Sequence, residues 1–405
     1  MGGSNRDASE AMGAVRAAPE ATLDPAAVAN AVDLVGTILA LKANQRIISG
    51  MVRDGRESGM ARAVRKHDTA AIYDWLMGLL SLQGISDQIA FGYIEKWGNA
   101  TYAGLAQRLE TTRCACPKLR DFASYTGCSY RKGKGTCANP QHLRLCPVRQ
   151  LPLRKGLLNI QAVSLYHWLA DVCGGDLVAM IDRVIAAAKA STEVDSDPVA
   201  GIRGDGGPPS PYAGAMEQVD RTDPPGAPGP PAWLQQAKSS LITSFSAVEG
   251  VSAKLANMSL AALMIGGRPK DSDWTAVATQ MVTVDSLIHN HFERTGVLSA
   301  LQAEHSYGPG CYGPEGCEAV IFKVTRLLQA RSTGLKSASS DQRWPTPIDV
   351  QKALWRFCTA GVLDFCNAAR VGLEPGCRAA DGCPAAVHCA KAITCGWPDP
   401  ADEQP

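Results

Sequence analysis

The chain has 405 residues, 45% of them hydrophobic, and its formal net charge is +1. That length suffices for two or three domains or for one elaborated domain, and the hydrophobic share suffices for a buried core. A charge so close to zero excludes polyanion binding by bulk charge alone. The sequence has no run of about 18 apolar residues, which a membrane-spanning helix would need. Residues 1–21 also lack the apolar stretch of a signal peptide, so we expect a cytoplasmic protein without a membrane span.

Composition and turn residues divide the chain into eight segments. These are a disordered N-terminus (1–25), a helical region (26–112), a basic cysteine-rich insert (113–155), a helical continuation (156–190), a disordered linker (191–231), a second helical region (232–345), a closing helix with a cysteine loop (346–395) and a tail (396–405). The linker holds seven glycines and nine prolines in 41 positions, a composition typical of disorder.

Apolar residues recur at helical spacing in several segments. Residues 69–98 predict two helices that are joined near Gly84 and end at Gly98, because glycine interrupts helices. Their buried stripe is expected to contain Ile72, Leu76, Leu79 and Leu80. A further helix is predicted after the linker, with one apolar face made of Leu234, Ala237, Leu241 and Phe245. Since no series of segments alternates with a period of two, the sequence predicts an all-α fold.

That helix runs into a turn and a second, alanine-rich helix, in the sequence "VEGVSAKLANM" from Val248 to Met258. Gly250 permits a tight bend, and Val251 can pack between the two helices. The backbone N–H groups at Gly250, Val251 and Ser252, together with the helix dipole, would form a phosphate-binding site. The dipole would also disfavour an ammonium on Lys254, and a neutral amine can act as a nucleophile. The simpler interpretation of Lys254 is a solvated surface lysine.

Asp285 follows an apolar run and precedes another predicted helix, in "VTVDSLIHNHFER". Aspartate is a good helix N-cap, and capping alone explains its presence there. A carboxylate beside a nucleophilic amine could also accept protons or stabilise a developing cation.

Three separated stretches of this chain resemble the helix-hairpin-helix DNA glycosylases of the endonuclease III family. "YDWLMGLLSLQGISDQIAFGYIEKWG" is similar to the family's early helix pair, with its Leu-Leu-Ser-x-Gln sequence ending at Gln83. "AVEGVSAKLANMSL" is similar to the hairpin, with Lys254 at the position of the Schiff-base lysine. "VTVDSLIHNHFER" is similar to the segment with the essential aspartate, which Asp285 matches.

The resemblance implies a two-lobed helical fold that ends in an iron–sulfur loop. It assigns catalysis to Lys254 and Asp285, and it assigns probing of the duplex beside an extruded base to Gln83. The sequence departs from the family at three positions. Ser252 replaces the second hairpin glycine, Glu249 replaces a proline, and Leu287 replaces a histidine.

Five cysteines fall between Cys366 and Cys395, and the family has a [4Fe-4S] cluster at this place in the chain. Such a cluster needs four converging thiolates. The family's Cys-Pro-x4-Cys turn is matched from Cys383 to Cys389. The resemblance therefore implies a cluster on Cys366, Cys377, Cys383 and Cys389, with Cys395 as an alternative to Cys366. A tetrahedral zinc site is the second interpretation.

The insert holds ten lysines and arginines but one acidic residue, a local excess of +9. Phosphates are the natural partners of such a segment, and Arg131, Lys132 and Lys134 lie at its centre. The interleaved Tyr125 and Tyr130 could stack on nucleic-acid bases.

The insert also has five cysteines, so it could fold around a second metal site. The candidate ligands are Cys114 or Cys116, with Cys128, Cys137 and Cys146, and His142 is a further donor. Zinc and a second iron–sulfur cluster both remain open, as does a loop of unligated thiols. Outside the two cysteine-rich stretches, Cys311 and Cys317 form a pair with or without a metal, and Cys173 and Cys358 are expected to be packed.

Together these features predict a monomeric DNA-repair glycosylase, with or without AP-lyase activity, that acts on double-stranded DNA containing a damaged base. It would extrude that base into a pocket. The alternative is a non-catalytic iron–sulfur protein that binds nucleic acid on the same scaffold, which the altered hairpin and Leu287 favour.

Overall fold

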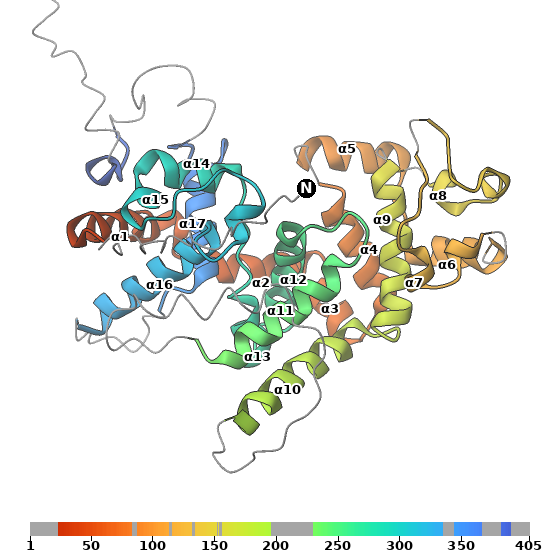
Figure 1. Ribbon diagram of the computed structural model, residues 1–405, viewed down its shortest axis with the longest axis horizontal. Helices are drawn as coiled ribbons and strands as arrows, with labels where there is room; N and C mark the ends of the chain where they lie inside the picture. Colours follow the sequence, from red (N-terminus) through yellow and green to blue (C-terminus); the bar gives the residue numbers. More distant parts are fainter. Residues whose placement is uncertain are drawn as a thin grey trace, which may run out of the picture.

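The computed structural model describes residues 23–82, 87–112, 116–131, 134–151, 153, 156–195, 230–334, 344–366 and 382–389. Within these ranges the chain forms helices and no β-strand, which confirms the all-α prediction (Figure 1). None of the described helices is long and apolar enough to cross a membrane. The predicted N-terminal disorder, the linker and the tail lie almost entirely outside the described residues.

The described helices pack around two hydrophobic cores. The large core gathers buried side chains from the middle of the chain, from Met60 to Met281, together with Ile348. Its elements are α3 (Met60–Arg65), α4 (Thr69–Leu80), α6 (Tyr102–Thr112), η3 (Pro117–Leu119), α7 (Phe122–Tyr125), α8 (Pro147–Gln150), α9 (Gly156–His167), η5 (Trp168–Val172), α10 (Leu177–Asp195), α11 (Ala232–Ser246), α12 (Ala253–Gly267) and α13 (Ser272–Ala278). Helix α5 (Asp87–Trp97) differs from these elements, because it exposes the apolar side chains of Ile89, Phe91 and Trp97.

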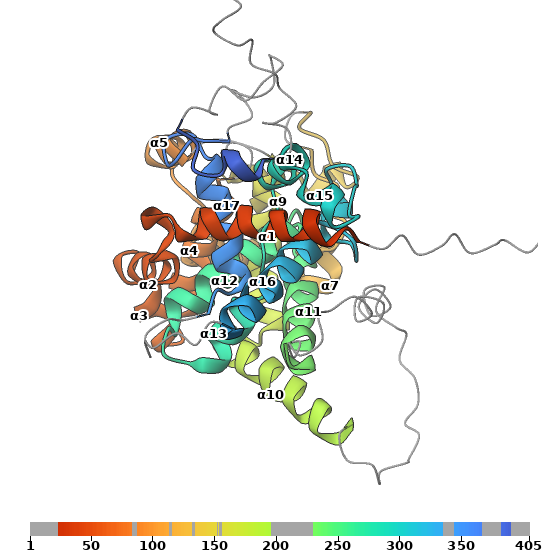
Figure 2. The ribbon, with the colours of Figure 1, turned by 90° about the vertical axis from the view of Figure 1, so that its left-hand side faces the viewer.

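The small core joins the first described helix to the last ones, as the side view in Figure 2 shows. Its elements are α1 (Pro25–Ala40), α14 (Ser286–Thr295), α15 (Val297–Ala300), η8 (Pro309–Tyr312), α16 (Cys317–Gly334) and α17 (Pro347–Cys358), with η9 (Ala386–His388) against α1. The chain passes from the large core at Met281 to the small core at Val282, three residues before Asp285. The predicted region 26–112 therefore contributes to both cores.

Local sequence signals explain where several helices begin. Asp24 caps α1, whose first residue is a proline, and Asp68 caps α4 by accepting a hydrogen bond from a backbone N–H. Helix α17 begins with a reciprocal capping box between Thr346 and Asp349. The expected breaks are also present, because α4 ends at Leu80 and the left-handed Gly98 follows α5.

Helix α2 (Ile47–Glu57) lies between the cores and packs against α12 and α17 (Figure 1). The crossing of α2 and α12 depends on glycine at the contact point. A Cβ atom added to Gly55 would lie 2.6 Å from the Cα of Gly266. Gly267 is similarly tight against Val64. Because backbone cannot yield as a flexible side chain can, Gly55 and Gly266 set how closely α2 approaches α12, whereas Gly267 sets the approach of the Val64 side chain on α3.

We predict that Gly55→Ala lowers the free energy of unfolding by about 1–3 kcal/mol, since the new methyl overlaps helix backbone. Gly50→Ala is the matched control on the same helix, because a Cβ there meets nothing within 4 Å. It should raise stability by about 0.5–1 kcal/mol through helix propensity. Urea denaturation of both variants measures the difference. Equal effects from the two substitutions would contradict a close crossing.

Candidate metal centres and hairpin

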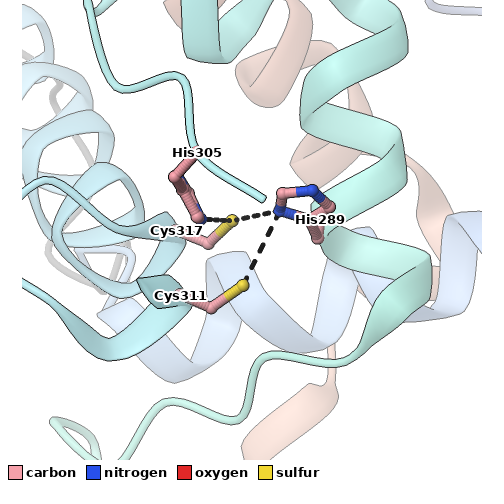
Figure 3. A group of neighbouring side chains, drawn as sticks. All are labelled: His289, His305, Cys311 and Cys317. Atoms are coloured by element: carbon pink, nitrogen blue, oxygen red, sulfur yellow. Dashed lines mark hydrogen bonds between the residues drawn. The ribbon is translucent and has the colours of Figure 1, made fainter. Parts of the chain in front are cut away.

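Two histidines and two cysteines of the small core bring their ligand atoms together (Figure 3). They are His289, His305, Cys311 and Cys317, here called the Cys2His2 group, and their ligand atoms all lie within 4.8 Å of one another. His289 Nδ1 is 3.6 Å from Cys311 Sγ and 3.4 Å from Cys317 Sγ. His305 Nε2 is 3.4 Å from Cys317 Sγ. This set could hold a metal ion.

Short-range sequence features build the group. His289 lies in the first turn of α14, and Cys317 is the first residue of α16. The loop between the two cysteines closes because residue 316 is glycine, where a Cβ would lie 2.6 Å from the carbonyl carbon of Cys311. Tyr312 fixes this loop to the strand-like segment before α14, since its hydroxyl accepts a hydrogen bond from Val284 N at 2.9 Å.

The surroundings of the Cys2His2 group favour the protonation states in which its side chains bind a cation. His305 Nδ1 lies 2.7 Å from Ala303 O, and a carbonyl oxygen can only accept, so this nitrogen carries the proton and Nε2 is free to coordinate. Burial lowers the pKa of His289, which favours the neutral imidazole that binds metals. Burial, and next the neighbouring Cys311, raises the pKa of Cys317. Two adjacent buried thiolates therefore need a nearby positive charge.

A second set lies on the other side of α14. His291, Cys358 and Cys366, here called the Cys2His group, also have ligand atoms within 4.8 Å of one another. His291 is fully buried, and neither ring nitrogen has a hydrogen-bond partner of ordinary geometry among the described residues. The Cys358 thiol lowers the pKa of Cys366, with smaller contributions from His291 and Arg294, so Cys366 is the favoured thiolate of the pair. This set too could hold a metal ion.

The predicted C-terminal ligands are thus described in part. Cys366 belongs to the Cys2His group, whereas Cys377 and the alternative Cys395 lie outside the described residues. Cys383 packs against the small core. Cys389 follows η9, which is held to α1 where the side-chain amide of Asn30 donates to His388 O at 2.9 Å. The expectation that Cys358 is packed is confirmed by its burial, but the sequence did not predict its place in a metal-ligating group.

Four cysteines of the basic insert, here called the insert cysteines, line one small pocket together with His142. They are Cys116, Cys128, Cys137 and Cys146. No three of their sulfur atoms lie within 4.8 Å of one another, so this set is spaced more widely than the two groups of the small core. Burial raises the pKa of Cys128 and of Cys146. The alternative ligand Cys114 lies outside the described residues.

The expected stacking of bases on insert tyrosines is wrong. Tyr125 is fully buried in the large core and donates its hydroxyl proton to Ile160 O, and Tyr130 is 3% exposed. Because the insert packs on α9, these two aromatic rings are part of the large core and not of the surface. Arg131 and Lys134 are exposed, as a phosphate contact requires, and Lys132 lies outside the described residues.

Helices α11 and α12 form the predicted hairpin, and all four apolar residues expected on one face of α11 are buried. Gly250 has φ 80° and is exposed, Val251 is buried, and Ser252 caps α12 by accepting from Leu255 N. The backbone of Gly127 donates to the Glu249 carboxylate at 2.8 Å. Glu249 therefore fastens the cysteine-rich insert to the hairpin turn.

The two predicted catalytic residues belong to different cores. Lys254 is half-buried in the first turn of α12. Asp285 is the N-cap of α14 and accepts a hydrogen bond from Ile288 N at 3.1 Å, so the capping interpretation is confirmed. Burial raises the pKa of Tyr307, and the negative charge of Asp285 adds to that shift. At Lys352 burial lowers the pKa, and Asp54 and then Asp285 counteract it. Gln83, the third residue taken from the resemblance, lies outside the described residues.

Lys352 lies in a cleft of about 500 Å³ between α2 and α17 that the sequence did not predict. The cleft is also lined by Arg46, Arg53 and Arg356, with Asp54 as the acidic residue among them. Burial lowers the pKa of Lys352, and Arg356 adds to this effect. Lys352 is therefore a second half-buried lysine to weigh against Lys254 wherever an amine nucleophile is considered.

Comparison of the chain with protein-family models, with curated proteins and with solved structures finds no match.

We predict that Lys352→Met raises the free energy of unfolding at neutral pH, because the wild-type chain buries a charge there. The pKa of Lys352 is lowered from 10.5 in the folded state, so the unfolded chain binds more protons in the interval up to 10.5. Wild-type stability should therefore rise relative to the variant as pH increases through that interval. Chemical denaturation between pH 7 and 10.5 tests this, with the exposed Lys42→Met as control. A less stable Lys352→Met protein would contradict it.

Proposed function

We propose that this protein is a DNA glycosylase of the helix-hairpin-helix type, with Lys254 as its nucleophile. The observation that carries the proposal is the hairpin itself. Its exposed turn at Gly250 and Ser252 leads directly to Lys254 at the start of α12. The two-core arrangement adds support, because the chain crosses from one core to the other immediately before Asp285.

The chemistry would proceed at C1′ of a nucleotide whose base has been extruded from the duplex. Asp285 would assist departure of the base and take up the proton of the attacking amine. The Lys254 nitrogen would form a bond to C1′ as the bond from C1′ to the base breaks, and the base would leave with that electron pair. Opening of the sugar ring would give an imine. Removal of a C2′ proton would then expel the 3′-phosphate by β-elimination, which is the lyase step.

Two parts of the surface suit the DNA backbone. A helix start favours phosphate, and the turn before α12 exposes Gly250 and Ser252, whereas Val251 is buried and its N–H donates to Val248 O. The exposed Arg131 and Lys134 belong to the insert that Glu249 fastens to this same turn. In this proposal they hold phosphates next to those at the hairpin, together with Lys132, and Gln83 enters the duplex beside the extruded base.

We predict that borohydride traps a covalent complex between the protein and DNA with an abasic site or an oxidised pyrimidine. Lys254→Ala should abolish the complex, and Lys352→Ala, the matched half-buried lysine, should retain it. Asp285→Asn should slow base removal by about 100-fold or more, the usual contribution of a general acid or base. Gel electrophoresis measures all three. A complex that disappears only in Lys352→Ala would move the chemistry to the cleft between α2 and α17.

The alternative is a non-catalytic nucleic-acid-binding protein. Two contacts favour it: Glu249 adds a carboxylate to the hairpin turn, and Asp285 already has a hydrogen-bond partner as a helix cap. On this alternative no lesion gives a trapped complex while DNA binding persists. Binding that weakens with salt and falls in an Arg131→Ala, Lys134→Ala double variant would then define the function.

We also propose two iron–sulfur clusters, one on the C-terminal cysteines and one on the insert cysteines. At the C-terminus, Cys366 and Cys383 both pack on the small core, and Cys358 adds a thiol to the family's pattern. The donors described there include a histidine and are close enough for a single ion, so zinc is the competing metal. In the insert, four cysteines around one pocket with wider sulfur spacing suit a [4Fe-4S] cube better than one ion. Either cluster would fix a loop beside the proposed DNA surface.

We predict that anaerobically purified protein is brown, absorbs near ~400 nm and contains about four iron atoms for each cluster. Cys128→Ser should remove about four irons, and Cys366→Ser should remove the remainder. The buried Cys173→Ser is the control and should remove none. Iron and acid-labile sulfide assays provide the counts. Colourless protein with zinc at both places would contradict the clusters.

The eleven described cysteines are all free thiols, which suits a reducing compartment. We propose a cytoplasmic location on this ground, and the glycosylase proposal itself implies a monomer with double-stranded DNA as its partner.

A further inference from the structure

We propose that the Cys2His2 group is a structural zinc site that is separate from the cysteine-rich clusters. Zinc bound by two thiolates and two imidazoles has Zn–S distances of about 2.3 Å and Zn–N distances of about 2.0–2.1 Å. A tetrahedron of these lengths has N···S edges of about 3.5–3.6 Å. The three measured N···S distances are 3.6, 3.4 and 3.4 Å. Three of the six edges thus match a zinc-sized tetrahedron, and all the other ligand-atom separations are within 4.8 Å.

The same geometry excludes a cluster with the same donors. In a two-iron centre of the Rieske type, both histidines bind one iron and both cysteines bind the other, so nitrogen and sulfur lie across the cluster. Here His289 Nδ1 is within 3.6 Å of both sulfur atoms, and all four ligand atoms are within 4.8 Å of one another. That spacing fits one ion.

The surroundings fit zinc held permanently and not zinc used in catalysis. Four protein ligands fill a tetrahedron and leave no position for water or substrate. Three of the four residues are buried, and His305 is oriented by its hydrogen bond to Ala303 O. Cys317 at the first position of α16 gains further support as a thiolate from the helix dipole.

The ion would join α14, the loop that follows α15, and the start of α16, all within residues 289–317. As Figure 3 shows, His289 reaches the group from α14, whereas Cys311 and Cys317 come from the opposite side and His305 from the intervening loop. Zinc would therefore hold the 305–317 loop on the first turn of α14. Since Asp285 caps that turn, the site also fixes the direction of its carboxylate. The zinc site itself does not depend on glycosylase activity.

Elemental analysis of the purified full-length protein provides the first test. We expect about one zinc per chain that is lost in His289→Ala and in Cys317→Ser. The ion should remain in Cys173→Ser, a buried cysteine of the large core, and in Cys128→Ser, an insert cysteine. Zinc lost only from Cys128→Ser, or iron in place of zinc at the Cys2His2 group, would overturn the assignment.

Two measurements on the unmutated chain cover the case in which the variants fail to fold. Protein produced with cobalt should show the intense visible bands of tetrahedral Co²⁺ and thiolate charge transfer in the near ultraviolet. Mass spectrometry after alkylation should find Cys311 and Cys317 protected until a zinc chelator is added, and protected again after Zn²⁺ but not Mg²⁺ is restored. Free alkylation of both thiols without chelator, or a disulfide between them, would refute the site. Loss of DNA trapping with zinc retained would count against the proposed function alone.

Discussion

The small core buries imidazoles and thiols side by side, and one of them, His291, has no hydrogen-bond partner for either ring nitrogen among the described residues. Two imidazoles on α14 and four thiols around them lie in a largely apolar interior, where an unpaired polar group costs about 1–3 kcal/mol. Coordinated cations would convert this cost into cross-links. A domain with few helices and long connecting loops gains most from such links, because each one fixes a loop that hydrophobic packing alone would leave loose.

The large core follows different rules. It is stabilised by ordinary helix packing around α12, which is buried along most of its length. The cysteines associated with it are mostly those of the insert, which line one pocket. The two cores meet through α2, whose contact with α12 is backbone against backbone at Gly55 and Gly266. A stiff joint of this kind favours a fixed relation between the hairpin on one side and α14 on the other.

Much of this organisation could be predicted from the sequence, because apolar periodicity and capping residues indicate helices. The all-α class, the hairpin with its left-handed Gly250 and the cap role of Asp285 all follow from local signals. The clustering of cysteines in the insert was equally visible. The Cys2His2 group was only half visible: Cys311 and Cys317 stand in a conspicuous glycine-rich loop, but their partner histidines are brought in by tertiary packing. His289 and Cys358 look like ordinary helix residues in sequence.

Two other outcomes depended on burial, which composition does not reveal. Tyr125 lies in a strongly basic stretch, yet the insert turns its aromatic ring inward and its charges outward. In the sequence, Lys352 is like any lysine of an amphipathic helix. Its place in the cleft depends on α2, which lies against α17. In both cases the neighbouring residues are similar to those at exposed positions, and the distinguishing factor is a helix that arrives from elsewhere in the chain.

His289 and His291 are two positions apart on α14, so their side chains point about 200° away from each other around the helix axis. With metal bound on each flank, the helix would be held by coordination bonds on two opposite sides. It can neither roll about its axis nor slide without straining coordination bonds on both sides. Two bound metals would therefore restrain rotation of α14 about its axis, and with it the orientation of the Asp285 carboxylate at its N-terminus.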